Sequence, residues 1–379
     1  MKEVAFNSNH WDLVIDSPGR INIIGEHTDY NNGFVLPTAI DKKIQFKFNK
    51  NGSLNTCNIH SVNFNTSLSF ELNAVYKSEK QWENYILGVI YEIQQLTDKL
   101  RGFDCVLDSD IPVGSGISSS AALECGLAFG LNELFDLNLS KQTIVELSQR
   151  AEHNYVGTKC GIMDQFASVM SKKDHVILLD CQSLEYEYVP IKIEPFKILL
   201  LNTNVSHNLA SGEYNVRRSQ CEKGVEIIKQ KYPEVNSLRD VSYSMLQEFK
   251  NEISNIVFNR CVYVVQEKER VLSSVKALKK SLLHKMGEYM YETHDGLQNL
   301  YEVSCPELDF LVDFTKKYDD VIGARMMGGG FGGCTINIIH QDAIDGFIKD
   351  ASEAYFDKFN IALTAFEAMP CGGTNIKQT

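Results

Sequence analysis

The sequence has few of the features that stabilise secreted proteins or hold proteins in membranes. Its ten cysteines are scattered over 379 residues with no two closer than four residues, so the C-x-x-C pattern of zinc and redox sites is absent. No apolar run approaches the roughly 20 residues of a membrane span, and residues 1–12 contain no apolar signal-peptide core. Scattered free thiols are typical of a reducing compartment, where most are small buried hydrophobic residues. We therefore expect a cytoplasmic protein without a membrane partner.

Basic residues are also in short supply. The chain carries 37 Lys and Arg against 49 Asp and Glu, which gives a formal net charge of −12. Binding to nucleic acid or to an anionic membrane surface requires clustered basic side chains that neutralise phosphates, so we expect no nucleic-acid partner. A small phosphorylated ligand is not excluded, because it needs only a local pocket.

The remaining composition is that of an ordinary globular protein, with 44% hydrophobic residues, 23% charged residues and 8 prolines. The length exceeds the roughly 250–300 residues that one hydrophobic core serves. Mixed strand and helix patterns in both halves predict an α+β protein with two domains, residues 1–175 and 176–379. The predicted strands are 13–15, 43–48, 103–107, 175–179 and 196–201, and the predicted helices are 82–96, 118–135, 140–156 (with Ser140 as N-cap), 219–231, 259–280, 282–293 and 342–359.

The richest group of reactive side chains lies in residues 17–37, SPGRINIIGEHTDYNNGFVLP. Within ten residues this segment offers Arg20, Glu26, His27 and Asp29. Carboxylates accept hydrogen bonds from sugar hydroxyls, and an arginine steadies a phosphate or a neighbouring carboxylate. The segment either binds a ligand rich in hydroxyl groups or forms a solvated turn with surface salt bridges. Its composition alone leaves both interpretations open.

A second motif, IPVGSGISSSAALE, occupies residues 111–124. Glycines lead into three serines and then into the small first turn of a predicted helix. Free backbone N–H groups and the positive end of the helix dipole favour an anion at such a place. No lysine follows the glycines, so the motif is not a Walker P-loop. A serine N-cap would explain one serine but not the whole run, and the motif therefore predicts a phosphate site.

A third motif, GARMMGGGFGGC, occupies residues 323–334. Residues 328–333 satisfy the G-x-G-x-x-G string of dinucleotide-binding folds. A strand-like run follows it in place of a helix, so we reject that interpretation. Five glycines in six residues predict a turn pressed against another domain or against a ligand phosphate.

Two carboxylates lie between the second and third motifs, in residues 151–166. Glu152 is predicted at the end of a helix, and Asp164 lies among apolar neighbours. An isolated carboxylate in such surroundings is costly unless it is paired, which makes Asp164 a candidate base. The alternative is an N-cap aspartate, and the local composition does not decide between them.

Taken together, these segments resemble the galactokinase family, within the superfamily of galactokinase, homoserine, mevalonate and phosphomevalonate kinases. The three superfamily motifs match residues 18–24, 112–122 and 323–333 in order. Segments specific to galactokinases match as well, namely GEHTDYN at 25–31, CGIMDQ at 160–165, EYNVRR at 213–218 and VSCPELD at 303–309. The resemblance covers residues 17–333. It implies a two-lobed α+β small-molecule kinase fold of the galactokinase/mevalonate kinase type, with the active site between the lobes.

The resemblance also implies roles for individual residues. Asp164 and Arg20 would flank the C1 hydroxyl of the sugar, with Asp164 accepting or orienting its proton and Arg20 stabilising negative charge. The sugar hydroxyls would be held by Glu26, His27, Asp29, Gly161, Asp164 and Tyr214. Trp82 would pack on adenine, and the ATP phosphates would be cradled by Gly114, Ser115, Gly116, Ile117, Ser118, Ser119 and Ser120. The ligands of Mg²⁺ would be Ser120 and Glu152.

The implied activity is ATP-dependent phosphorylation of the C1 hydroxyl of galactose by a monomeric enzyme. Two alternatives use the same scaffold, an N-acetylgalactosamine kinase and a non-catalytic sugar- and ATP-sensing regulator. Such a regulator could lose Arg20 or Asp164 without losing binding, and both are present. The sequence departs from the usual family pattern at Met327, where threonine is common, and at Tyr263, where histidine is common. We expect neither departure to touch the sugar pocket.

Overall fold

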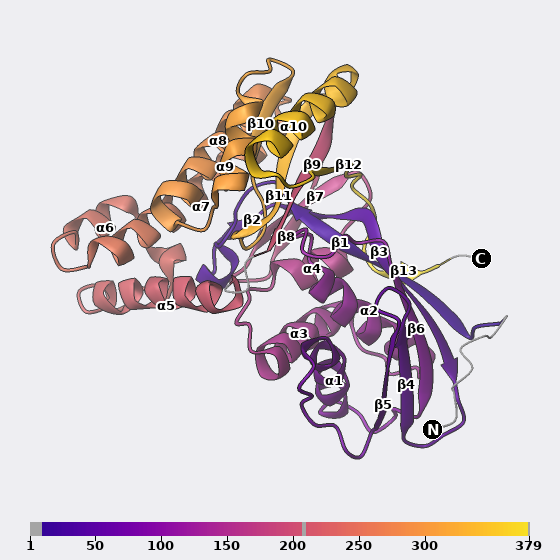
Figure 1. The fold of residues 1–379 in the computed structure, drawn as a ribbon. Coiled ribbons are helices and arrows are strands. Elements are labelled where there is room, and N and C mark those ends of the chain that lie inside the picture. Colours follow the sequence, from indigo (N-terminus) through magenta and orange to yellow (C-terminus); the bar gives the residue numbers. More distant parts are fainter. Residues whose placement is uncertain (1–9, 207–209, 378–379) are drawn as a thin grey trace.

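The computed structural model describes residues 10–206 and 210–377. Two β-sheets form the centres of two lobes, and most of the helices pack against these sheets (Figure 1). The predicted two-lobed α+β architecture is confirmed. No helix within the described ranges is long and apolar enough to cross a membrane.

The first sheet has six strands in the order β13-β1-β3-β6-β4-β5. All neighbours are antiparallel except β4 and β6, which run parallel. In the second half of β3 the alternating pattern buries every second side chain, Ile44, Phe46 and Phe48. The strands are β1 (Leu13–Asn22), β3 (Pro37–Lys50), β4 (Thr56–Ser61), β5 (Thr66–Glu71), β6 (Phe103–Ser109) and β13 (Asn375–Ile376).

Four helices belong to this first lobe: α1 (Gln81–Gln94), α2 (Ser119–Leu134), α3 (Lys141–Ala151) and α4 (Met163–Met170). The central helix α2 lies unusually close to the sheet. A Cβ on Gly126 or Gly130 would stand 2.2 Å from the ring of Phe46 or Phe48. This close approach brings the start of α2, which carries the second motif, down to β1, which carries Arg20.

The second lobe contains a four-stranded antiparallel sheet in the order β10-β11-β9-β12. Its strands are β9 (Phe196–Ser206), β10 (Val321–Met326), β11 (Gly332–His340) and β12 (Thr364–Glu367). The helices against it are α8 (Leu283–Gly296), α9 (Pro306–Thr315) and α10 (Ile344–Phe359). A small three-stranded sheet of β2 (Phe34–Val35), β7 (His175–Asp180) and β8 (Tyr186–Pro190) completes the strands.

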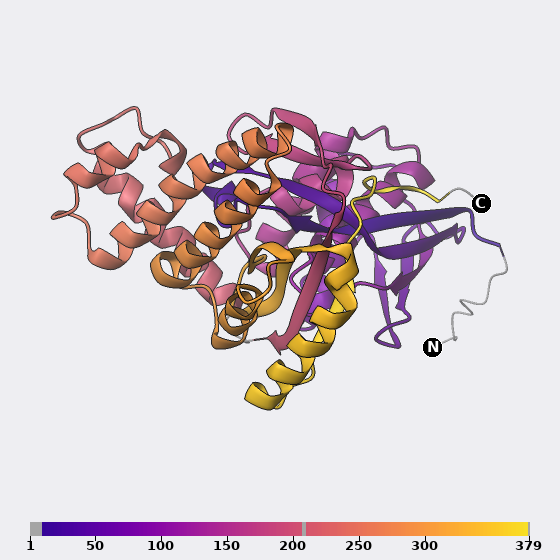
Figure 2. The same cartoon turned by 90° about the horizontal axis from the view of Figure 1, so that it is seen from above.

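The remaining helices α5 (Ala210–Lys229), α6 (Tyr243–Glu248) and α7 (Asn255–Lys279) project from the sheets on the side away from β13. Figure 2 shows the same separation from above. The last described residues return to the first lobe, because β13 pairs with β1. The domain boundary near residue 175 stays a prediction.

Most predicted elements are present, with shifted ends. Ser140 caps α3 as expected, accepting a hydrogen bond from the Thr143 N–H at 3.0 Å. The predicted helix 140–156 is α3 followed by a π-helical turn at residues 152–156. The helix predicted at 219–231 begins earlier, at residue 210. Residues 323–326, which were expected in a loop, form the last four residues of strand β10. The short elements α4, α6, α9, β2, β4, β5, β8, β12 and β13 were not predicted.

Candidate active site

Arg20 of β1 and Asp164 of α4 form a two-point ion pair. Nε of Arg20 lies 2.7 Å from Oδ1 of Asp164, and Nη2 lies 2.8 Å from Oδ2. The third guanidinium nitrogen, Nη1, donates to the carbonyl oxygen of Gly116 at 2.7 Å. The Arg20 side chain is 5% exposed and the Asp164 side chain 27%, so one edge of the carboxylate stays open. The helix N-cap is Ile162, so Asp164 is not the N-cap aspartate of the alternative interpretation.

The second motif connects directly to this ion pair. Ser118 has a left-handed backbone (φ +60°), and its Oγ donates to Oδ2 of Asp164 at 2.5 Å. Ser115 turns inward, with its hydroxyl donating to the Pro112 carbonyl oxygen at 2.7 Å, and the Ile117 side chain is buried in the core. Ser119 begins helix α2. The loop therefore offers backbone groups, the helix N-terminus and outer serines to an anion.

The third motif is pressed against the second. A Cβ on Gly328 would stand 3.0 Å from the Gly116 carbonyl oxygen, and one on Gly330 would stand 2.1 Å from the Val303 carbonyl oxygen. Both glycines have φ of +83°, which disfavours any other residue. The neighbour of this turn is therefore protein backbone, and the turn forms one wall of the site.

Glu26 ties the first motif to the third. Its Oε1 accepts from the Gly328 N–H at 2.9 Å, while Oε2 lies 2.6 Å from Asn22 Nδ2 and 2.9 Å from Arg325 Nη2. Burial raises the pKa of Glu26, and Arg325 and the Gly328 N–H oppose that rise. Because protein donors occupy both carboxylate oxygens, Glu26 fixes the loop geometry.

Asp29 and Gly161 are in direct contact. A Cβ on Gly161 would stand only 2.0 Å from Oδ2 of Asp29. Burial raises the pKa of Asp29 to about 7, and the nearby negative charge of Asp164 adds to this rise. Gly161 therefore contributes the space that the Asp29 carboxylate occupies.

His27 lies within a group of tyrosine rings. Its ring centroid is 4.9 Å from that of Tyr301 and 5.4 Å from that of Tyr214, and its Nδ1 is 2.8 Å from the Tyr30 hydroxyl oxygen. Burial lowers the pKa of His27 to about 3, an effect to which Arg217 adds. The imidazole is therefore neutral at physiological pH.

The predicted catalytic and sugar-binding side chains converge on one cavity of about 120 Å³. It is lined by Arg20, Glu26, His27, Asp29, Glu152, Asp164 and Tyr214, with Gly161 packed behind Asp29. Sequence reasoning missed Thr158, Cys160, Met163, Gly328 and Gly329, which also line it. Apart from Thr158, these lie inside the third motif and the CGIMDQ segment, so full use of those segments would have found them.

A separate pocket of about 220 Å³ lies beside the N-terminus of α2 and contains Trp82, Ser119 and Ser120. Its other walls are mostly apolar and aromatic and include Phe64, Tyr85, Leu107 and Val113. Phe64 lies in the turn between β4 and β5 and is 61% exposed, a placement that the sequence pattern does not reveal. An apolar slot next to serine hydroxyls and a helix N-terminus suits a base attached to phosphates.

Glu152 lines the sugar cavity and belongs to a buried group of carboxylates. Gln165 Nε2 donates to Glu152 Oε2 at 3.0 Å and to Glu124 Oε2 at 3.3 Å. Burial and the charge of Asp164 raise the pKa of Glu152 to about 7. Among the described residues, Oε1 of Glu124 has no hydrogen-bond partner, and no cluster of three or more His, Cys, Asp or Glu could hold a metal. Glu152 and Glu124 share a neutral partner, Gln165, and form no ion pair in the described residues. This environment is compatible with a bound cation that has one or two protein ligands.

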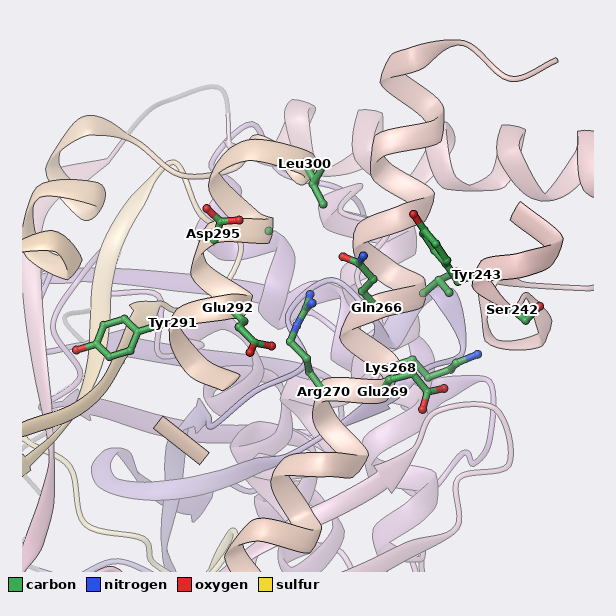
Figure 3. Close-up of a pocket in the computed structure, with 12 residues that line it drawn as sticks. Ser242, Tyr243, Gln266, Lys268, Glu269, Arg270, Tyr291, Glu292, Asp295 and Leu300 are labelled. Atoms are coloured by element: carbon green, nitrogen blue, oxygen red, sulfur yellow. The ribbon is translucent and has the colours of Figure 1, made fainter. Parts of the chain in front are cut away.

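A larger cavity of about 740 Å³ lies elsewhere, between α6, α7 and α8 (Figure 3). None of the predicted site residues lines it. One of its wall residues, Arg270, donates to Glu267 Oε2 at 2.7 Å, and Glu267 Oε1 accepts from the Gly25 N–H at 2.9 Å. This wall therefore supports the sugar loop from behind.

Comparison with known proteins agrees with the resemblance of the motifs. Residues 3–48 match the galactokinase galactose-binding signature, residues 84–172 the GHMP kinases N terminal domain and residues 274–357 the GHMP kinases C terminal family. The chain is 43% identical over 366 residues to a galactokinase of Thermosipho africanus, covering 96% of this chain and all of that one. The chain belongs to the galactokinase family.

Other members of the galactokinase family are similar over most of their length. A galactokinase of Clostridium beijerinckii is 41% identical, covering 92% of this chain and 90% of that protein. The crystal structure of Lactococcus lactis galactokinase complexed with galactose superposes with a TM-score of 0.92 at 32% identity, covering 96% and 94% of the two chains. Methanococcus jannaschii mevalonate kinase, at a TM-score of 0.66 and 18% identity, shares the fold.

As expected, neither Tyr263 nor Met327, the two departures from the family pattern, lines the sugar cavity. Tyr263 contacts the sugar loop, since its hydroxyl donates to the Glu26 carbonyl oxygen at 3.0 Å. Its ring lies 4.8 Å from that of Tyr301. Tyr263 therefore supports the wall of the sugar cavity, which sequence reasoning could not see because α7 is remote in the chain. Met327 is buried in the core and lines neither of the two pockets.

Proposed function

We propose that this chain is a galactokinase that transfers the γ-phosphoryl group of ATP to the C1 hydroxyl of galactose. The Arg20–Asp164 ion pair is the observation that carries the proposal. The open edge of its carboxylate faces a small cavity rich in hydrogen-bonding groups, and its arginine and its serine partner both reach the glycine-rich phosphate loop. A hydroxyl and a phosphate would therefore meet at Asp164.

Asp164 accepts a hydrogen bond from the C1 hydroxyl and aligns its oxygen with the γ-phosphorus. Two hydrogen bonds from Arg20 and one from Ser118 hold the carboxylate in place and disperse its negative charge. Phosphoryl transfer through a loose transition state requires little early proton removal. Asp164 therefore takes the proton late, as the C1 O–P bond forms and the bond between the γ-phosphorus and the ADP oxygen breaks.

Arg20 has a second task beyond holding Asp164. Its guanidinium is fixed between the carboxylate and the Gly116 carbonyl oxygen, at the junction of the sugar cavity and the phosphate loop. A preorganised positive charge at that junction stabilises the charge on the transferring group without reorganisation. Because Arg20 is almost fully buried, little solvent screens this interaction.

The sugar is bound by acceptors and donors from several elements. Asp29 accepts from a hydroxyl, while His27 and Tyr214 close the aromatic side of the cavity. Glu26 and Gly161 act by placing the third motif and Asp29.

ATP occupies the second pocket and the adjoining loop. Its adenine packs on Trp82, and its phosphates lie along residues 114–120 at the N-terminus of α2. Mg²⁺ would be held by Ser120 and Glu152 together with phosphate oxygens, and it supplies charge neutralisation on the phosphates. A hydroxyl and a carboxylate are the hard oxygen ligands that this ion prefers.

The proposal extends to the state of the protein in the cell. All ten cysteines lie in the described part of the chain and all are free thiols, which supports a reducing cytoplasm.

The direct test is ATP turnover with galactose, N-acetylgalactosamine and glucose, followed by NMR of the products. We expect turnover with galactose and a phosphate on C1. Preferred phosphorylation of N-acetylgalactosamine would replace the proposal with the sibling kinase. Sugar and ATP binding without turnover would replace it with a sensor.

A further inference from the structure

A chain of buried hydrogen bonds runs from the core of the second lobe to the sugar cavity. Cys221 Sγ lies 3.2 Å from the Tyr301 hydroxyl oxygen, which lies 2.7 Å from the Tyr30 hydroxyl oxygen. The Tyr30 hydroxyl in turn lies 2.8 Å from Nδ1 of His27. The four residues come from α5, the π-helical turn after α8, and the first motif.

On the cavity side of the imidazole, the Gly329 backbone is a polar protein neighbour. Within the described residues, Nε2 of His27 is buried and has no hydrogen-bond partner. His27 is 4% exposed and lines the sugar cavity beside Gly329. A buried polar nitrogen without a hydrogen bond costs folding free energy, so we expect Nε2 to form a hydrogen bond with a ligand.

The imidazole is neutral and carries one N–H. Burial lowers the pKa of His27 to about 3, with Gly329 backbone opposing and Arg217 adding to that change. Burial also raises the pKa values of Tyr30 and Tyr301 well above their usual range. Both phenols are therefore protonated, and each hydroxyl has one hydrogen to donate.

Only two directions of donation are available to such a chain. In one, the thiol donates to Tyr301, Tyr301 to Tyr30, and Tyr30 to Nδ1 of His27. In the other, every bond is reversed and the chain ends on sulfur. An imidazole nitrogen is a much stronger acceptor than a thiol sulfur, so the first direction is favoured. It leaves the His27 proton on Nε2.

We propose that Tyr30 and Tyr301 are positioning residues that set the tautomer of His27. In that tautomer, Nε2–H donates to a hydroxyl oxygen of the sugar. An ionised carboxylate of the cavity can only accept hydrogen bonds, so a donor at His27 lets one sugar hydroxyl donate to a carboxylate and accept from Nε2–H at the same time. The identity of this ligand rests on the proposed function, whereas the tautomer does not.

The test begins with ¹⁵N NMR of histidine-labelled protein without sugar, with the His27 signals assigned by their loss in His27→Gln. We expect the proton on Nε2 and a hydrogen-bonded, unprotonated Nδ1. Tyr30→Phe should shift the Nδ1 signal, and Tyr301→Phe should shift it less in the same direction. Tyr355→Phe is the matched control, because Tyr355 is also buried and loses one hydroxyl bond, to the Thr203 carbonyl oxygen, far from the cavity.

Kinetics supplies the second readout. Loss of one buried neutral hydrogen bond predicts a rise of about 3- to 10-fold in KM for galactose in Tyr30→Phe, with kcat and KM for ATP changed less than about twofold. A proton on Nδ1 in the unmutated protein, an unchanged His27 spectrum in Tyr30→Phe, or an unchanged galactose KM would each overturn the proposal. Failure of the unmutated protein to phosphorylate galactose would refute the proposed function and leave the tautomer measurement standing.

Discussion

Gly161→Ala tests one steric contact, the one between position 161 and the Asp29 carboxylate. A Cβ added there would stand 2.0 Å from Oδ2 of Asp29, against about 3.4 Å for ordinary contact, so Gly161→Ala must push the carboxylate by more than 1 Å. The φ of Gly161 lies outside the left-handed region, so backbone strain adds nothing. We therefore expect Gly161→Ala to act through the position of the Asp29 carboxylate.

The magnitude follows from that displacement. A misplacement of about 1 Å in a binding site costs on the order of 100-fold in catalytic efficiency, which corresponds to about 2.7 kcal/mol of transition-state stabilisation. We expect the loss in kcat/KM for galactose. KM for ATP should be nearly unchanged, because Asp29 lines the sugar cavity and not the Trp82 pocket.

A double-mutant cycle identifies the cause. Asp29→Gly alone removes the carboxylate together with its Cβ, and Gly161→Ala should then add almost no further loss, because its three nearest contacts, at 2.0, 2.1 and 2.6 Å, are all atoms of the Asp29 side chain. The control is Gly346→Ala in α10, where an added Cβ meets nothing within 4 Å. Thermal unfolding of each variant checks that it is folded. Additive losses in the cycle, or a folded Gly161→Ala protein with normal galactose kinetics, would refute the reasoning.

Three further predictions concern Asp29 in the sugar cavity, Ser118 in the phosphate loop and Trp82 in the proposed adenine pocket. Because burial raises the pKa of Asp29 to about 7, kcat/KM for galactose should rise between pH 6 and 8 as that carboxylate ionises, and Asp29→Asn should abolish the inflection; an identical profile would contradict this. Ser118→Ala removes one donor from Asp164 and should lower kcat about 10-fold in steady-state assays, with little change in galactose binding. Trp82→Ala should raise KM for ATP about 10-fold or more and leave KM for galactose unchanged, as measured by varying each substrate in turn.

The sequence was sufficient to predict the two-lobed fold and the main members of the site, because the chemistry is concentrated in short motifs. Arg20 and Asp164 are 144 residues apart, yet each lies in a segment whose residue types already point to a ligand. Their convergence could be expected only through the family resemblance. No local pattern in the sequence predicts which face of β1 packs against α4.

The supporting residues were beyond sequence reasoning for a physical reason. Tyr263, Tyr301 and Glu267 lie on helices whose patterns are typical of core packing, and their polar atoms matter only because α7 and the turn after α8 press against the first motif. Such contacts are set by tertiary packing, which periodicity does not encode. Short strands such as β4 and β5 were missed because their residues are largely polar.

The role of Asp164 is the central claim, and one variant tests it most directly. Asp164→Asn keeps the size of the side chain and removes the charged acceptor opposite the C1 hydroxyl. Single-turnover transfer from ATP to galactose should slow by about 10²–10⁴-fold, while calorimetry shows galactose and ATP binding within a few-fold of the unmutated protein. A folded Asp164→Asn protein that transfers phosphate to C1 at a normal rate would contradict the account.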